Sequence, residues 1–295
     1  MRVIRPCAKE TMMQRYDAVF FDLYGTLVDI RTDESSDAAW EALREALTAQ
    51  CGASYPDNES LRSRFDALAA PICAAAVARH GEWAEPDLLP VYRGLAHDSG
   101  DDQVARALAW TFRRASTSLL RLYPGASELL ARLRTAGLRI VLVSNAQSCY
   151  TRPELDLLGL TATFDLIVIS SEAGVRKPSP ELFRRALEAE QLAPSRVVMI
   201  GNDERADILG ARAAGIDGIY LRTAISPSDD PAASAHAVCS LAGPDYASLM
   251  RYLGIPADLR AGRTVEGQSA GLPGGLPDGA AEKATEKTTA ECSED

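Results

Sequence analysis

Short runs of apolar residues recur along the chain, and each ends at a small or polar residue. Helical patterns lie between the later runs, and two of these helices precede a glycine that suits a left-handed cap. Continuous apolar strands that alternate with helices are typical of a parallel sheet covered on both faces. The pattern therefore predicts an α/β fold, a Rossmann-like doubly wound parallel sheet. The expected strands are residues 17–21, 140–143, 166–169, 197–200 and 218–221, and the expected helices are residues 126–136, 180–190 and 206–214.

The alternation stops between residues 33 and 121, which are rich in Ala, Leu and Arg and contain no convincing strand. We expect this segment to be a helical cap, inserted after the first strand into a core formed by residues 16–32 and 122–255. The expected cap helices are residues 38–49, 60–79, 87–95 and 102–120.

The two ends of the chain differ from the rest in composition. Residues 1–15 are polar, lack the apolar stretch of a secretory signal, and are expected to be an N-terminal extension. Residues 256–295 contain almost no large apolar side chains. A segment of this kind cannot bury enough surface to offset its ordering entropy, so we expect a disordered tail.

Charge and cysteine content narrow the classes of function. Lys and Arg total 31 against 41 Asp and Glu, a formal net charge of -10, which argues against a nucleic-acid or anionic-membrane surface. A small anionic substrate remains possible, because a local site can be positive on an acidic protein. No run reaches the roughly 20 apolar residues of a membrane span. The six cysteines form no Cys-x-x-Cys pair, which favours reduced thiols in a cytoplasmic protein. Nothing in the sequence indicates an oligomeric state.

Polar residues follow four of the expected strands. Asp22 follows the first, Ser144 and Asn145 the second, Lys177 the third after a loop, and residues 202–207 the fourth. In an open parallel sheet, ligands bind beyond the carboxyl ends of the strands. We therefore expect these groups to form one site.

Asp22 is the candidate nucleophile. A carboxylate can attack phosphorus or carbon and form a covalent ester that water then cleaves. Gly25 and Thr26 follow closely and favour a nest of backbone N–H groups that binds an anion. Thr26 either contacts the substrate or fixes this turn. The alternative for Asp22 is a structural cap of a helix or turn.

Ser144, Asn145 and Lys177 are candidates for contact with an anionic substrate. The Ser144 hydroxyl suits a phosphoryl or carboxylate oxygen, although it can also cap the next helix. Lys177 precedes Pro178, so its backbone is expected to be extended. Its ammonium can neutralise a substrate anion and orient Asp22, whereas the usual fate of a lysine is a solvated surface.

Asp203 and Asp207 flank a short turn that opens a helix. Near Asp22 they would form an oxygen-rich site suited to Mg²⁺. They would also be favourable simply as acids at a helix N-terminus, and Asp207 has the further alternative of bracing Lys177 or the loop.

Four segments resemble the motifs of the haloacid dehalogenase-like (HAD) superfamily: residues 21–28, 142–145, 177–178 and 200–215. The resemblance covers roughly residues 16–250. It implies a hydrolase in which Asp22 is the nucleophile and Lys177 assists it. It also implies that the Tyr24 backbone carbonyl joins Asp22, Asp203 and Asp207 around Mg²⁺.

The chain departs from the phosphatases of this superfamily at two positions. Tyr24 stands where they carry a second aspartate as general acid, and an unperturbed tyrosine with a pKa near 10 is a poor proton shuttle. Asp-x-Tyr-Gly-Thr resembles 2-haloacid dehalogenases instead, in which halide leaves without a proton. Asn202 stands where many of the phosphatases carry a metal aspartate, so Asp203 would have to substitute. A cap residue is a possible proton donor, and the candidates are His80, His97 and Glu82.

The fourth motif, in contrast, departs from the dehalogenases. Glu204 and Phe183 stand where those enzymes tend to carry an asparagine and an aromatic hydroxyl. The preferred interpretation is a Mg²⁺-dependent phosphatase acting on a small phosphorylated metabolite. One alternative is a metal-independent 2-haloacid dehalogenase-type hydrolase, and another is a non-catalytic binding protein with the same fold. EDTA distinguishes the first two, and a protein of the third kind turns over no substrate.

Overall fold

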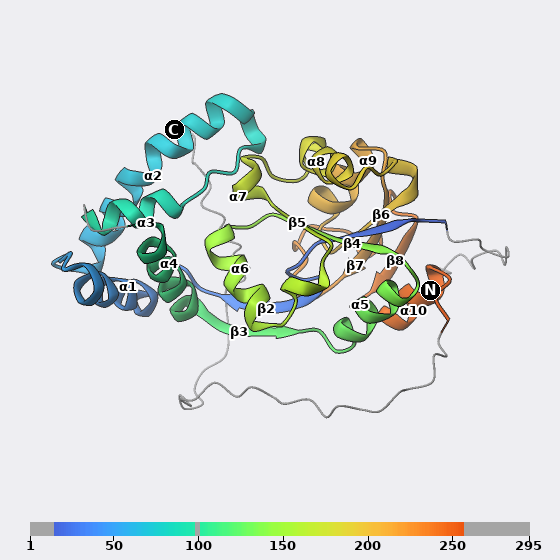
Figure 1. Cartoon of the computed structure of the whole chain (residues 1–295), viewed down its shortest axis with the longest axis horizontal. Coiled ribbons are helices and arrows are strands. Elements are labelled where there is room, and N and C mark those ends of the chain that lie inside the picture. Colours follow the sequence, from blue (N-terminus) through green and yellow to red (C-terminus); the bar gives the residue numbers. More distant parts are fainter. Residues whose placement is uncertain (1–14, 98–100, 257–295) are drawn as a thin grey trace.

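The computed structural model describes residues 15–97 and 101–256 (Figure 1). The expectations for residues 1–14 and 257–295 therefore lie outside the described residues. None of the described helices is long and apolar enough to cross a membrane.

Six parallel strands form the central sheet in the order β5-β4-β1-β6-β7-β8. The chain winds outward from β1 through β4 to β5, and then returns to the other side of β1 for β6, β7 and β8. This reversal is the doubly wound topology, so the fold prediction is confirmed. The strands are β1 (Ala18–Phe21), β4 (Arg139–Ser144), β5 (Leu166–Ile169), β6 (Val197–Gly201), β7 (Asp217–Arg222) and β8 (Cys239–Ala242).

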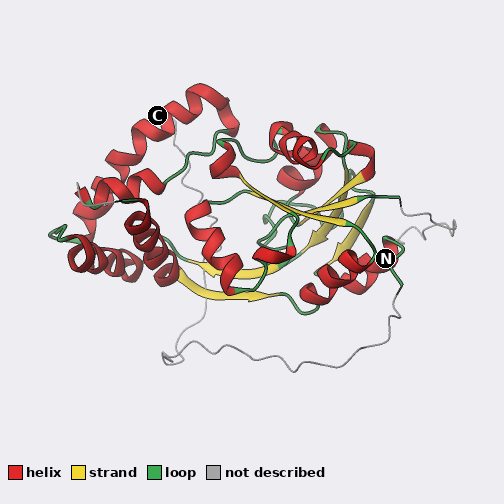
Figure 2. Ribbon diagram, in the orientation of Figure 1, coloured by secondary structure: helices red, strands yellow, loops and turns green. Residues whose placement is uncertain are grey.

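Helices cover both faces of this sheet (Figures 1 and 2). Val19 and Phe21 of β1 belong to the apolar cluster under α5 (Ala126–Thr135) and α10 (Tyr246–Tyr252). The alternate residues of β1 face the cluster under α8 (Pro180–Glu190) and α9 (Gly210–Ala213). Because strand side chains alternate between faces, one apolar run supplies both layers. The other core helices are α6 (Ser148–Leu157) and α7 (Ser170–Ala173), with short helical turns at Thr161–Thr163, Pro194–Arg196 and Glu204–Leu209.

The segment after β1 forms a separate helical layer, seen on the left of Figure 1. Its helices are α1 (Asp37–Cys51), α2 (Asn58–His80), α3 (Leu89–Leu95) and α4 (Asp102–Ser116), with a short turn at Gly81–Trp83. They enclose their own apolar core, in which Trp40 packs edge-on against Phe65 and Phe112. Tyr150 of α6 extends this core to the main domain.

The expectation that residues 33–121 contain no strand is wrong at their C-terminal end. Strand β3 (Thr117–Leu122) pairs antiparallel with β2 (Val28–Thr32), and α4 stops at Ser116 rather than at residue 120. The hydroxyls of Ser116 and Thr117 both donate to the Arg113 carbonyl and satisfy the helix end. Pairing with β2 makes residues 117–122 a strand. The helical pattern of the cap sequence gives no indication of this distant partner.

Candidate active site

Asp22 lies directly beyond β1, where the winding of the sheet reverses. Its side chain is buried, and its backbone N–H donates to the Ile200 carbonyl at 2.9 Å. The next residues turn tightly, because the N–H groups of Leu27 and Val28 both donate to the Leu23 carbonyl. The turn therefore holds the Asp22 carboxylate at the carboxyl edge of the sheet.

Gly25 is required in this turn for two reasons. Its φ of +85° is disfavoured for residues with a Cβ, and a Cβ there would lie 2.3 Å from Asn202 Nδ2. The glycine thus lets the loop after β1 and the loop after β6 approach each other.

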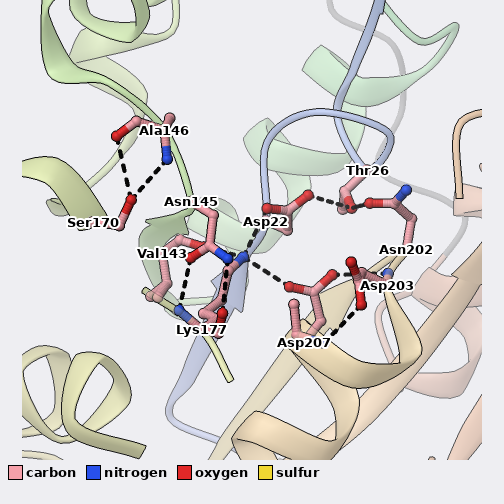
Figure 3. Close-up of polar contacts among 11 residues, drawn as sticks. Asp22, Thr26, Val143, Asn145, Ala146, Ser170, Lys177, Asn202, Asp203 and Asp207 are labelled. Carbon is pink, nitrogen blue, oxygen red and sulfur yellow. Dashed lines mark hydrogen bonds and ion pairs between the residues drawn. The ribbon is translucent and has the colours of Figure 1, made fainter. Parts of the chain in front are cut away.

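Lys177 is buried among acceptors rather than solvated. Its Nζ donates to Asp22 Oδ1 at 2.8 Å, to Asp207 Oδ1 at 2.7 Å and to the Val143 carbonyl at 2.8 Å (Figure 3). These three bonds use every proton of the ammonium. Burial lowers the pKa of Lys177, but the charges of Asp207 and Asp22 outweigh this, so the net pKa lies above its ordinary value. The lysine therefore stays charged beside Asp22.

The hydrogen bonds of Asp207 support Lys177 and the loop after β6. Besides Lys177, it accepts the Asp203 N–H at 3.0 Å through Oδ2. A Cβ at Gly201 would lie 2.2 Å from the same oxygen, so this carboxylate needs a glycine beneath it. Burial and, to a smaller extent, the charge of Asp22 raise the pKa of Asp207, whereas Lys177 lowers it. The net pKa is about 7. Of the roles considered from sequence, the support of Lys177 agrees with these contacts.

Asp203 caps the turn that follows β6. Its Oδ1 accepts the Ala206 N–H at 2.7 Å. It nevertheless lines a hollow of about 50 Å³ beside Asp22. The residues around this hollow are Asp22, Tyr24, Asn145, Lys177, Asn202, Asp203, Ala206 and Asp207.

The three candidates for substrate contact lie close together but differ in their bonding. Ser144 is fully buried at the end of β4, and its hydroxyl has no hydrogen-bond partner among the described residues. Asn145 exchanges two bonds with the backbone of Lys177, at 2.8 and 3.0 Å. Thr26 Oγ1 lies 3.3 Å from both Asp22 Oδ2 and Asn202 Oδ1. Ser144 thus keeps a hydroxyl without a bond of its own, although it does not line the hollow beside Asp22, whereas Asn145 and Thr26 are bonded to other residues of the site.

The Tyr24 side chain points into the boundary between cap and core. Its hydroxyl contacts Thr151 Oγ1 at 2.9 Å and donates to the Glu154 carboxylate, both on α6. Burial, and then the charge of Glu154, raise the pKa of Tyr24 well above its ordinary value. The tyrosine is therefore even less suited to proton transfer than its sequence position indicated.

Arg113 of α4 completes this buried network. Its guanidinium bonds Glu154 Oε1 at 2.7 Å and Glu34 Oε1 at 2.7 Å, and lies 5.9 Å from the centre of the Tyr24 ring. Sequence reasoning missed Glu34, Arg113 and Glu154. Their side chains meet only in the folded chain, and no local pattern marks them.

The cap residues considered as proton donors lie elsewhere. His97 stacks on Tyr55 within the cap, with ring centres 6.0 Å apart. His80 lies against Gly174, and Glu82 is exposed. None of the three lines the hollow beside Asp22.

Glu85 is a buried acid that sequence reasoning also missed. Its backbone N–H donates to the Gly174 carbonyl at 3.1 Å, and its Oε1 accepts Gln147 Nε2 at 3.1 Å. Its Oε2 has no partner among the described residues. Burial raises its pKa to about 7, against the opposing charge of Arg176. Glu85 thus joins the connection between α2 and α3 of the cap to the loop after β4.

Replacing Glu85 by glutamine is expected to change the pH dependence of stability. The folded pKa of about 7 exceeds the unfolded value of about 4.3, so wild-type stability falls as the pH rises through this window. Glutamine does not titrate, so the variant should gain up to about 3 kcal/mol relative to wild type between pH 4.5 and pH 8. Urea unfolding at both pH values measures the difference. The exposed Glu82→Gln is the control, and equal pH dependence in both variants would contradict the assignment.

Comparison with known proteins identifies one matching family model, relatives of similar sequence and solved structures with the same fold. The model described as haloacid dehalogenase-like hydrolase matches residues 16–215. The phosphoserine phosphatase of Thermus thermophilus is 36% identical over 182 residues, 61% of this chain and 72% of that protein. The N-acetylmuramic acid 6-phosphate phosphatase of Pseudomonas aeruginosa is 30% identical over 220 residues, 74% of this chain and 87% of that protein. The chain spans about half the length of two other curated phosphatases that it matches, 53% and 54%.

Solved structures share the fold at lower identity. The 2-haloacid dehalogenase from Pseudomonas syringae pv. Tomato DC3000 superposes with a TM-score of 0.56 at 20% identity, covering 81% of this chain and 98% of that chain. At this identity the likeness is one of fold alone.

Proposed function

The chain belongs to the haloacid dehalogenase-like hydrolase family, and we propose that within this family it is a phosphomonoesterase that uses Asp22 as its nucleophile. The observation that carries the proposal is the Asp22 carboxylate held by the buried ammonium of Lys177 at the carboxyl edge of the sheet. The relatives named as phosphatases support phosphate esters of small molecules as substrates.

The proposed reaction has two displacements at phosphorus. An Asp22 oxygen attacks phosphorus, a P–O bond forms, and the P–O bond to the alcohol breaks, so that the alcohol leaves with the bonding electrons and takes up a proton from water. Water then attacks the aspartyl phosphate, which releases inorganic phosphate and restores the carboxylate. Lys177 offsets the charge that gathers on the phosphoryl oxygens, and the unpartnered hydroxyl of Ser144 donates to one of them.

We further propose that Mg²⁺ assists this reaction. The residues that would hold it include Asp22 and the Tyr24 carbonyl, with Asp203 on the rim of the same hollow. No three His, Cys, Asp or Glu side chains among the described residues are grouped to hold a metal ion. Mg²⁺ does not need such a group, because it keeps several waters and uses one or two carboxylates. The bound ion would neutralise charge on the phosphoryl group.

A dehalogenase-type reaction is the second candidate, and one observation favours it. The Tyr24 hydroxyl is committed to Glu154 and Thr151, so it offers no proton to a leaving group. Halide needs none. The attack of Asp22 on carbon would otherwise be the same displacement.

The test is hydrolysis of a panel of small phosphomonoesters and 2-haloacids by the full chain, with Mg²⁺ and with EDTA. The proposal expects phosphate release that EDTA reduces by at least about tenfold, because the ion offsets charge in the transition state. Halide release that is indifferent to EDTA would replace it with the second candidate. No turnover of either class would leave a binding protein with a hydrolase fold.

A further inference from the structure

Tyr24 joins the turn that carries Asp22 to a helix of the core. This turn, residues 22–28, is called the nucleophile turn below. The Tyr24 hydroxyl bonds Thr151 and Glu154, which are three residues apart and therefore share one face of α6. The Tyr24 side chain thus ties the nucleophile turn to α6.

The carboxylate of Glu154 bridges Tyr24 and an arginine of the cap. Its Oε2 accepts the Tyr24 hydroxyl, and its Oε1 accepts Arg113 Nε at 2.7 Å. The side chain of Glu154 is 1% exposed, and that of Arg113 is 10% exposed. A carboxylate buried to this extent depends on the cation that pairs with it. The acceptor of the Tyr24 hydroxyl is therefore held in place by Arg113.

Arg113 is enclosed by side chains of both cap and core. Its guanidinium lies 5.9 Å from the ring centre of Tyr24 and 5.2 Å from that of Tyr150 on α6. Its Nη1 donates to Glu34 Oε1 at 2.7 Å, shortly before α1. Arg113 itself belongs to the last turn of α4, which lies beside α6 (Figure 1). Through these contacts Arg113 connects both ends of the inserted segment to the nucleophile turn.

The polar side chains of the nucleophile turn have partners of two kinds. Asp22 and Thr26 bond Lys177 and Asn202, which line the hollow beside Asp22. Tyr24 instead bonds two residues of α6 that lie outside the list of those lining the hollow. Loss of the bond to α6 therefore alters the support of the turn without removing a group from the hollow.

We propose that Arg113 is a positioning residue: through Glu154 it fixes the Tyr24 hydroxyl, and thereby the turn that holds Asp22 at the edge of the sheet. The inference rests on the proposed role of Asp22 as nucleophile. Attack requires the reacting atoms to be aligned about 3–3.5 Å apart, so a small displacement of the carboxylate lowers the rate more than the binding of substrate. Tyr24 thereby has a function that requires no proton transfer.

Amide hydrogen exchange tests the connection without any substrate. Arg113→Met removes the cation and is expected to speed exchange of the Leu27 and Val28 N–H groups, which close the nucleophile turn, at least about tenfold. Exchange in β4 and β6 should stay as in wild type. The matched control is Arg152→Met on α6, where the arginine pairs with an exposed glutamate of α7, and this variant should leave the turn unchanged.

A double variant separates positioning from folding. Arg113→Met leaves Glu154 as an unpaired buried carboxylate, which destabilises the protein as a whole. Arg113→Met/Glu154→Leu removes that charge as well, so its resistance to urea should recover. Its turn should still exchange at least about tenfold faster than in wild type, because Tyr24 has lost its acceptor. Wild-type exchange of the turn in this double variant, or an equal rise in β4 and β6, would overturn the inference.

Kinetics on the best phosphomonoester show whether Arg113 acts through Tyr24. Arg113→Met and Tyr24→Phe are each expected to lower kcat at least about tenfold and to leave KM within about threefold. Combined, they should cost no more than the larger single loss, because both break the same connection. Arg113→Lys keeps a cation beside Glu154 and should recover most of kcat. Losses that multiply, or a lysine variant no better than the methionine variant, would overturn the inference.

The outcomes separate this inference from the proposed function. A faster-exchanging turn in a protein that hydrolyses neither phosphomonoesters nor 2-haloacids would keep the connection and reject Asp22 as a nucleophile. Phosphate hydrolysis with an unchanged turn in the variants would keep the phosphomonoesterase and reject Arg113 as its positioning residue.

Discussion

Asp22→Asn is expected to lower turnover by at least about three orders of magnitude while the protein stays folded. The amide keeps the shape of the side chain and removes the anion that attacks. It also keeps an oxygen toward Lys177, which now lies 2.8 Å from Oδ1, so the site is not left empty. Initial rates on the best phosphomonoester, with thermal unfolding of the same samples, measure both effects.

The matched control is Asp29→Asn. Asp29 is also a buried carboxylate, and it is paired with Arg121 at 2.9 Å on the β2–β3 ribbon, away from the hollow. Its rate should stay within a few-fold of wild type. If Asp22→Asn retains more than a tenth of wild-type turnover, Asp22 is not the nucleophile.

Lys177→Met is expected to damage both stability and activity. It leaves the buried carboxylates of Asp22 and Asp207 without their shared cation, and breaking a buried ion pair costs about 3–5 kcal/mol. With the cation gone, the folded pKa of Asp207, already raised to about 7 by burial, rises further above its unfolded value. The loss of stability should therefore grow as the pH rises, and urea unfolding at pH 5 and pH 8 measures it.

A second substitution separates folding from chemistry. The double variant Lys177→Met/Asp207→Asn removes one of the two buried carboxylate charges that Lys177→Met leaves unpaired. It should therefore recover part of the stability and none of the activity. A single variant as stable as wild type at pH 8 would show that the Lys177 ion pairs contribute little. Recovery of turnover in the double variant would show that the ammonium is not needed for the reaction.

The sequence predicted the core strands because each one contains a continuous apolar run, including the edge strand β5, which is only partly buried. It did not predict β8, a four-residue edge strand that is only partly buried, or the β2–β3 pair. Strands of these kinds lack a continuous apolar run, and their identity depends on a distant partner. Helix α4 was predicted too long for the same reason.

Their positions at strand ends were enough to predict that the site residues lie close together. The direction of each side chain could not be predicted in this way. Tyr24 could be recognised as a departure at the nucleophile loop. Its contacts with Thr151 and Glu154 depend on α6, about 130 residues later in the chain. Likewise, the bond from Ala206 N–H that engages Asp203 depends on the local turn rather than on residue type.

The β2–β3 ribbon has a consequence for how the cap can be exchanged. It brings the two ends of the inserted segment together, since the Asp33 N–H donates to the Ser116 carbonyl at 2.7 Å. Because its two ends are adjacent, the inserted segment can be replaced by another cap without changing the path of the chain through the core. Arg113 limits that exchange, because this residue of the inserted segment forms an ion pair with Glu154 of the core. A transplanted cap must therefore carry an equivalent arginine, or Glu154 must change along with it.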